Sequence, residues 1–293
     1  MKLSSLLILL FLPVLPICSQ TEWKILPGTG QLAVIESSHS MFPHPQRMNG
    51  HTYKDGLYSF KGHYDDSSTA VFIPENFVPG DSIDLVFYFH GWGNNIHKSL
   101  EKFKLLEQFS RSAKNAVLVF PQGPKNAPDS FGGKLEEKGM FKNLVNDVLE
   151  FLRSEKKTCA AKPDRIILSG HSGAFRVISF ILNRGGLTEH ISEVYLFDGL
   201  YGQLQKFAYW LCNSSGRLIN IITPNGGTKY TSDEFLADLT DWNIQYYKHE
   251  KNEISADELK KERIIFIYTD QGHSEIINPY FKLFLKTSGL KTF

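Results

Sequence analysis

From residue 82 onward, short apolar runs alternate with longer segments of helical periodicity. The runs are rich in β-branched and aromatic residues and carry no polar face, as strands covered on both sides of a sheet require. Six runs have this character: residues 83–90, 116–121, 165–170, 193–198, 217–223 and 263–269. They predict the α/β fold class: a mostly parallel central sheet flanked by helices on both faces.

Between the runs, apolar residues recur at steps of three and four. The clearest set forms one face of a predicted helix: Phe141, Leu144, Val145, Val148, Leu149 and Leu152. A less regular set is Leu100, Phe103, Leu106 and Phe109. Parallel strands need such crossover helices. Residues 21–80 show no helical period, and only 69–74 reads as a strand, so we expect antiparallel edge strands and loops there.

The first twenty residues differ from the rest. Lys2 precedes an apolar run that is too short to span a bilayer and is interrupted by Pro13 and Pro16, which disfavour a buried helix. We interpret residues 1–20 as an export signal and 21–293 as a single domain, secreted or periplasmic. Residues 15–18 loosely resemble a lipoprotein box, so a membrane association is expected only if Cys18 is lipidated.

Charge and cysteine content narrow the picture further. The 32 basic and 31 acidic side chains nearly balance, which disfavours nucleic acid as a partner. Removal of the signal leaves Cys159 and Cys212, which either form a disulfide in an oxidising compartment or are two buried thiols.

The most specific motif lies in residues 165–182, where an apolar run, the turn Gly170-His171-Ser172-Gly173-Ala174 and an apolar helix follow one another. A sharp strand-to-helix turn requires small residues two positions before and after its centre, as Gly170 and Ala174 are. Here the chain resembles the α/β-hydrolase family, although Ala174 replaces the usual second glycine. The resemblance implies a serine hydrolase with Ser172 as nucleophile.

The same resemblance implies the remaining site residues. His90-Gly91 at the end of the run 83–90 places one oxyanion-hole N–H on Trp92, and the residue after the nucleophile, Gly173, supplies the other. The family's base follows the last strand, which here is His273. We expect His171 to point away from the site, and His90 to end a strand.

The acid is ambiguous. Most family members carry it after the fifth of the six strands, but Asn225 stands there in this chain. A minority carries it one strand earlier, where Asp198 ends a strand before a glycine. We favour Asp198 over Asp233, which lies further along the usual loop, and place Asp270 third.

A group of three histidines, His39, His44 and His51, invites comparison with a zinc site. No cysteine or HExxH motif accompanies them, and Pro43 and Pro45 favour a loop. We therefore expect no metal and no cofactor. We expect these three histidines to line the mouth of the active site instead.

The function implied is an exported carboxylic-ester hydrolase acting on a small-molecule or polymer-borne ester, similar to polyhydroxybutyrate depolymerases and to feruloyl or acetyl esterases. Residues 198–217 leave little room for a large lid, and aromatic residues such as Trp92 and Phe131 are expected near the pocket. The alternatives are a serine peptidase acting on cell-wall or other peptides and a non-catalytic surface or binding protein that retains the fold.

Overall fold

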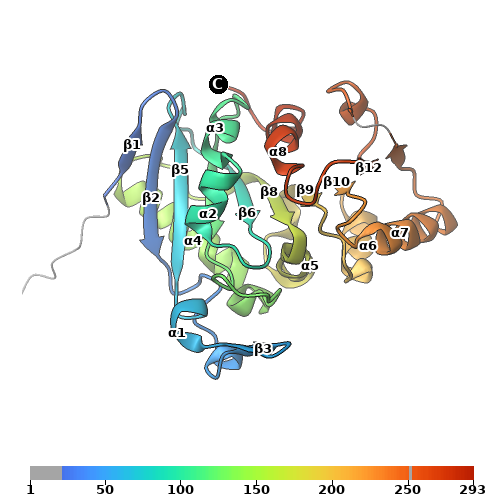
Figure 1. Cartoon of the computed structure of the whole chain (residues 1–293). Helices are drawn as coiled ribbons and strands as arrows, with labels where there is room; N and C mark the ends of the chain where they lie inside the picture. Colours follow the sequence, from blue (N-terminus) through green and yellow to red (C-terminus); the bar gives the residue numbers. More distant parts are fainter. Residues whose placement is uncertain (1–21, 251–252) are drawn as a thin grey trace, which may run out of the picture.

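The computed structural model describes residues 22–250 and 253–293, so the expected export signal and Cys18 lie outside the described residues. Ten strands of the described part form one sheet (Figure 1). Across the sheet they are β1 (Lys24–Leu26), β2 (Gly30–Glu36), β5 (Ser68–Pro74), β7 (Ala116–Pro121), β6 (Ile83–Phe89), β8 (Pro163–His171), β9 (Ile191–Phe197), β10 (Arg217–Ile222), β12 (Ile264–Tyr268) and β11 (Tyr247–His249).

The part of the sheet from β7 to β11 is parallel throughout. All six apolar runs are confirmed as strands of this part, and every residue of β6 and β7 is buried. The strand β11 was not predicted; it has three residues and pairs with β12 at the edge. The α/β class with a mostly parallel sheet is therefore confirmed.

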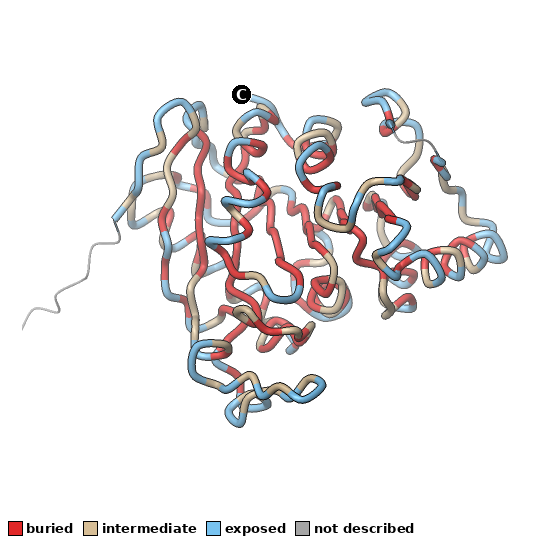
Figure 2. Tube along the Cα trace, in the orientation of Figure 1, coloured by how far each residue is buried: buried red, intermediate tan, exposed pale blue. Residues whose placement is uncertain are grey.

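The N-terminal strands are antiparallel, as expected. β1 pairs with β2, β2 with β5, and β5 with β7, which joins them to the parallel part. A separate hairpin of β3 (His51–Tyr53) and β4 (Gly56–Tyr58) stands below the sheet in Figure 1, and Figure 2 shows that much of it is exposed. This hairpin lies on the same side of the molecule as the start of α5 (Figure 1).

Helices cover both faces of the sheet. One face packs against α4 (Met140–Ser154), α5 (Phe175–Arg184), α6 (Leu204–Asn213) and α7 (Lys229–Asp241). The other packs against α2 (Ile96–Lys102), α3 (Leu105–Ser110) and α8 (Ile277–Lys286). All six apolar residues of the predicted face in α4 are buried.

The remaining helical segments are short: α1 (Phe60–His63) and the 3-10 helices η1 (Pro45–Arg47), η2 (Gly133–Glu136), η3 (Ser172–Ala174), η4 (Thr188–His190) and η5 (Glu258–Lys260). Among the described residues, every helix is too short or too polar to cross a membrane.

Both interpretations of the cysteines are wrong in this structure. Cys159 and Cys212 are unpaired, and both are exposed rather than buried. Cys159 follows the end of α4, and Cys212 lies on α6, where it faces solvent because the buried face of that helix is formed by other residues, among them Phe207 and Leu211.

Candidate active site

Ser172 lies on a sharp turn between β8 and α5. Its φ angle is +55°, in the left-handed region that non-glycine residues seldom adopt, and η3 leads from it directly into the helix. A Cβ on Gly170 would lie 2.9 Å from the Cβ of Ala174 and 2.6 Å from Ile178 Cδ1. The expected requirement for small residues around this turn is thus confirmed.

His273 and Asp198 form a pair at the same edge of the sheet. His273 lies in the loop between β12 and α8, and its Nδ1 is 2.7 Å from Asp198 Oδ2. Asp198 follows β9, is fully buried and has a φ of +47°. Of the two acids weighed most closely, Asp198 meets the histidine; Asp233 instead pairs with Lys229 on the same helix, at 2.6 Å.

The loop after β10, where most family members carry the acid, does not contain the acid here. It instead donates hydrogen bonds to the carboxylate of Asp198. The hydroxyls of Thr223 and Thr228 both donate to this carboxylate, one to each oxygen. Burial alone would raise the pKa of Asp198, but the hydrogen bonds from His273, Thr223 and Thr228 outweigh it and hold that pKa below its ordinary value. The carboxylate is therefore ionised beside the imidazole at neutral pH.

Gly226, in the same loop, lies directly over the carboxylate. A Cβ at Gly226 would be 1.4 Å from Asp198 Oδ2, so no larger residue fits while the acid keeps its place. Next to it, the Tyr201 hydroxyl donates to the Gly226 carbonyl. Burial and the charge of Asp198 raise the pKa of Tyr201 to about 12, against a lowering contact with the Ser172 side chain, so Tyr201 is a neutral donor.

His171 does not point away from the site, contrary to expectation. Its Nε2 is 2.9 Å from the carbonyl oxygen of His273, and the two imidazole rings are 4.5 Å apart between centroids. The physical reason is the alternation of side chains along β8, which places His171 on the sheet face covered by α8, and His273 enters from the loop before that helix. Burial, then the neighbouring His273, lowers the pKa of His171 to about 3, so it is neutral and donates through Nε2.

Ser172 and the Asp198–His273 pair share one edge of the sheet, since each follows a parallel strand. A Cβ at Gly199, the residue after Asp198, would lie 3.2 Å from the Ser172 carbonyl oxygen. Among the residues described, no hydrogen bond joins the Ser172 hydroxyl to His273; the side chain approaches Tyr201 instead. Catalytic hydrogen bonds are often long without substrate, and rotation about χ1 is the small change that redirects a serine hydroxyl.

Two backbone N–H groups near Ser172 fit the expected oxyanion hole. The Gly173 N–H is in the first turn of η3, where a helix leaves its amides unpaired. In the part of the chain described, the Trp92 N–H in the loop after β6 has no acceptor. A cavity of about 280 Å³ adjoins them, lined by Trp92, Ser130, Ser172, Gly173, Phe175 and Tyr201.

The aromatic wall of this cavity differs from expectation in one residue. Trp92 lines it and stacks edge-on against Tyr53 of the β3–β4 hairpin, with 5.1 Å between ring centroids. Phe131 does not line it: this ring is buried between the guanidinium groups of Arg47 and Arg176, at 4.6 and 5.3 Å.

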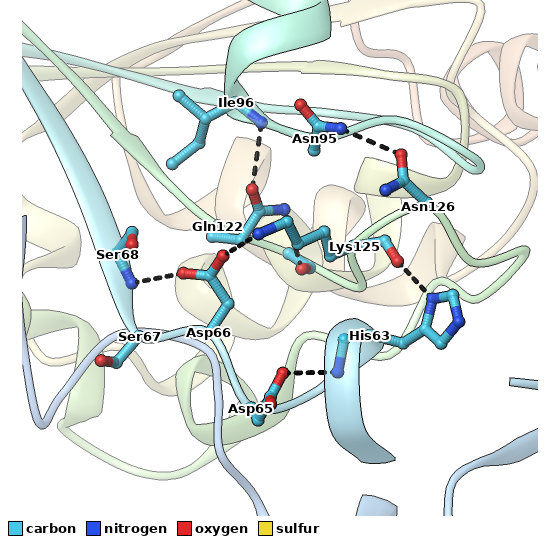
Figure 3. A network of polar contacts seen from close by, with 12 residues as sticks. His63, Asp65, Asp66, Ser67, Ser68, Asn95, Ile96, Gln122, Lys125 and Asn126 are labelled. Carbon is cyan, nitrogen blue, oxygen red and sulfur yellow. Dashed lines mark hydrogen bonds and ion pairs between the residues drawn. The ribbon is translucent and has the colours of Figure 1, made fainter. Parts of the chain in front are cut away.

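The loops after β6 and β7 are joined by polar contacts, several of which are drawn in Figure 3. Asn95 Nδ2 donates to Asn126 Oδ1 at 2.9 Å, and the Ile96 N–H donates to Gln122 Oε1 at 3.0 Å. His90 directly follows β6, which ends one residue earlier than expected, and its Nε2 accepts hydrogen bonds from Gln122 and from the Gly123 N–H. Burial lowers the pKa of His90 to about 4, which keeps this acceptor unprotonated.

None of the three N-terminal histidines lines the cavity beside Ser172, and His39 and His44 have different partners. His39 Nδ1 is 2.9 Å from Asp147, and His44 Nε2 is 2.9 Å from Glu137. Neither these two nor His51 lines the cavity beside Ser172. In residues 22–250 and 253–293, no group of three or more His, Cys, Asp or Glu side chains is arranged to hold a metal ion.

Comparison with known proteins places the fold. No family model matches this sequence, and no curated protein matches it. Several solved structures match it in fold. The feruloyl esterase module from Clostridium thermocellum, complexed with sinapinate, is 12% identical, with a TM-score of 0.55 over 90% of this chain and 89% of that one. An S-formylglutathione hydrolase from Agrobacterium tumefaciens is 10% identical, with a TM-score of 0.53 over 92% and 99%. The chain therefore has the α/β-hydrolase fold.

Proposed function

We propose that this protein is a carboxylic-ester hydrolase with Ser172 as nucleophile. Three features at one sheet edge carry the proposal: a serine on a strained turn, a histidine paired with a buried carboxylate at 2.7 Å, and two backbone N–H groups beside a cavity. Among the described residues, neither of these N–H groups has an acceptor. One structural neighbour named above is a feruloyl esterase module and the other an S-formylglutathione hydrolase, and the first of these names supports an ester as the substrate.

In the proposed reaction the Ser172 hydroxyl attacks the ester carbonyl carbon while His273 accepts the hydroxyl proton. Asp198 fixes the tautomer of His273 and stabilises its protonated form. The N–H groups of Trp92 and Gly173 donate to the oxyanion of the tetrahedral intermediate. The alcohol leaves with the proton from His273, and water then hydrolyses the acyl-enzyme by the same route.

The test combines a covalent probe with a substrate panel. A fluorophosphonate should label the wild-type protein at Ser172, and esters should be hydrolysed in preference to peptides. Ser172→Ala should abolish labelling and lower turnover by at least about a thousandfold without loss of folding. Ser154→Ala, a change at the exposed end of α4, is the matched control and should behave like the wild type.

Each alternative has its own outcome. Preferential cleavage of peptides would make the chain a serine peptidase, and a folded wild-type protein that neither reacts with the probe nor hydrolyses either class would be a binding protein that retains the fold. Full activity in Ser172→Ala would end the assignment of the nucleophile.

We also propose that the protein is exported. Support comes from the sequence alone, in the apolar run after Lys2 and its interruption by Pro13 and Pro16. Mass spectrometry of the mature protein would distinguish a free N-terminus near Cys18 from a lipid-modified Cys18, and an intact Met1 or Lys2 would contradict export by a cleaved signal.

A further inference from the structure

The side chain of Ser130 lies over the residue that follows the nucleophile. A Cβ at Gly173 would be 2.6 Å from Ser130 Oγ and 2.7 Å from Trp92 Nε1, so the serine and the indole both contact Gly173. Ser130 also lines the cavity that contains Ser172. Its hydroxyl is therefore beside the backbone donors Trp92 and Gly173, where the carbonyl oxygen of a bound ester is expected.

The direction in which the Ser130 hydroxyl hydrogen points follows from the hydrogen bond between Ser130 and Trp92. The indole Nε1 of Trp92 is 2.7 Å from Ser130 Oγ, and an indole N–H is only a donor, so Ser130 is the acceptor in this bond. The serine's own hydrogen must then point elsewhere. Among the described residues, no protein acceptor for it is found. A serine hydroxyl that accepts one strong hydrogen bond while its hydrogen faces a cavity is a donor available to a ligand.

The position of Ser130 is set by its two neighbours in the chain. The buried carboxylate of Asp129 accepts hydrogen bonds from Arg47 Nε, at 2.7 Å, and from the Phe131 N–H, at 2.9 Å. Both ends of the Ser130 peptide segment are thereby fixed. Donors held in place before substrate arrives stabilise a developing charge without a cost of reorganisation.

The position of Trp92 is set from the same loop. The Gly93 N–H donates to the Ala127 carbonyl at 3.0 Å, and the Asn126 N–H donates to the Asn94 carbonyl at 2.8 Å. Together with the side-chain contacts in Figure 3, these bonds join the loop that carries Trp92 to the loop that carries Ser130. The Trp92–Ser130 hydrogen bond thus links two loops that are already held together.

We infer that the Ser130 hydroxyl is a third hydrogen-bond donor to the carbonyl oxygen of the ester, beside the N–H groups of Trp92 and Gly173. Its bond strengthens as negative charge develops on that oxygen in the transition state. Trp92 contributes twice, through its backbone N–H to the oxygen and through its indole, which orients and polarises the hydroxyl of Ser130. This inference rests on the proposed ester-hydrolase function.

The test uses the full protein with p-nitrophenyl acetate and its thiono analogue, in which sulfur replaces the carbonyl oxygen and accepts hydrogen bonds weakly. Ser130→Ala should lower kcat by on the order of a hundredfold with little change in KM, because the lost bond belongs to the transition state. Ser130→Thr, which keeps the hydroxyl, should restore most of the rate. Circular dichroism and thermal melting check that each variant is folded.

The ratio of oxo to thiono rates identifies the role. The wild type and Ser130→Thr should show a large preference for the oxo ester, and in Ser130→Ala the preference should shrink by about the factor lost in kcat. A merely structural role would lower both rates equally and would overturn the inference, as would a wild-type kcat in Ser130→Ala. If Ser130→Ala fails to fold, Ser130→Cys, of similar size and a weak donor, should show the same loss of preference.

Failure of the proposed function gives a different result. If Ser172→Ala hydrolyses the acetate as fast as the wild type, or the wild type does not hydrolyse it, both proposals fail together. If hydrolysis depends on Ser172 and is unchanged in folded Ser130→Ala, the inference about Ser130 alone is wrong.

Discussion

The two sides of the cavity are built in different ways. On the side of the proposed oxyanion donors, the loops after β6 and β7 are joined by several separate contacts, among them those of His90 with the Gly123 N–H, of Asn95 with Asn126, and of the Gly93 N–H with the Ala127 carbonyl. On the acid side, the loops after β9, β10 and β12 meet at a single carboxylate, Asp198, which has contacts from each of the other two loops. The positions of the site residues therefore depend on several contacts on the first side and on one carboxylate on the second. Single substitutions of residues that hold the site in place without contacting substrate should therefore affect catalysis far more on the acid side.

The largest effect is expected at Asp198. Asp198→Asn keeps the shape but leaves the His273 imidazole in the wrong tautomer, which should lower turnover by on the order of ten-thousandfold. Asp233→Asn, whose carboxylate contacts Lys229, should have little effect. Ester hydrolysis under saturating substrate measures both, and the reverse pattern would move the acid to the later loop.

The next effect concerns the space over the carboxylate. Gly226→Ala would place a Cβ 1.4 Å from Asp198 Oδ2 and must displace either the loop or the acid. We expect turnover to fall by about a hundredfold or more, since misplacement by about 1 Å has this cost. Gly80→Ala is the control, because a Cβ there would make only an ordinary contact, at 3.4 Å from Ser82. Wild-type kcat in Gly226→Ala would show that the acid side tolerates movement.

On the oxyanion side, the corresponding change should affect stability more than catalysis. Asp129→Asn breaks a buried pair with Arg47 and should lower the free energy of unfolding by about 3 kcal/mol. Because the loops keep their other contacts, we expect turnover to fall by no more than about tenfold. Urea denaturation and ester hydrolysis measure the two quantities. Asp164→Asn, at a half-exposed pair with Lys291, is the control. A loss of catalysis as large as that in Asp198→Asn would contradict the comparison.

The smallest effect on catalysis is shared by both sides, because it is a loss of stability that depends on pH. Burial lowers the pKa of His90 to about 4 and that of His171 to about 3, whereas both have an ordinary value of 6.5 when unfolded. Below pH 6.5 the unfolded chain binds more protons than the folded one. The stability from these neutral imidazoles is therefore fully present above about pH 7 and is lost as the pH falls from there toward the folded-state pKa values. Urea denaturation at pH values from about 7.5 to about 5, a range that spans the ordinary histidine pKa, should show the decline. His97→Gln, at an exposed side chain, should leave the curve unchanged; a curve that is flat in the wild type would refute the assignment of buried neutral imidazoles.

Most of the sheet could be predicted because its strands lack a polar face. β6, β7 and β8 are each long enough for that pattern to be recognised, and the covering helices keep a clear period in α4. The strands β3, β4 and β11 have three residues each, too few for any period to show. Their pairing depends on neighbours that are distant in the sequence.

The site was predictable only where its chemistry is local. Ser172 could be selected as the candidate nucleophile because its strand, turn and helix are contiguous in the sequence. The sequence alone does not decide between Asp198 and Asp233, because the Asp198 carboxylate is held by threonines that lie 25 and 30 residues further along the chain. Ser130 lies in an irregular loop, and its contact with Trp92, 38 residues away, is the feature that indicates a role for it beside the cavity. His171 could have been found, since alternation from Ile167 along β8 puts it on the face of α8.

The adjacency of β9 and β10 bears on how such sites diverge. The carboxylate beside His273 projects from the end of β9, while the end of β10 contributes Thr223 to the same point in space. A carboxylate at the end of either strand would thus lie beside the same histidine. Relatives of this protein are accordingly better compared by superposed atoms than by aligned positions, since equivalent groups need not share a place in the chain.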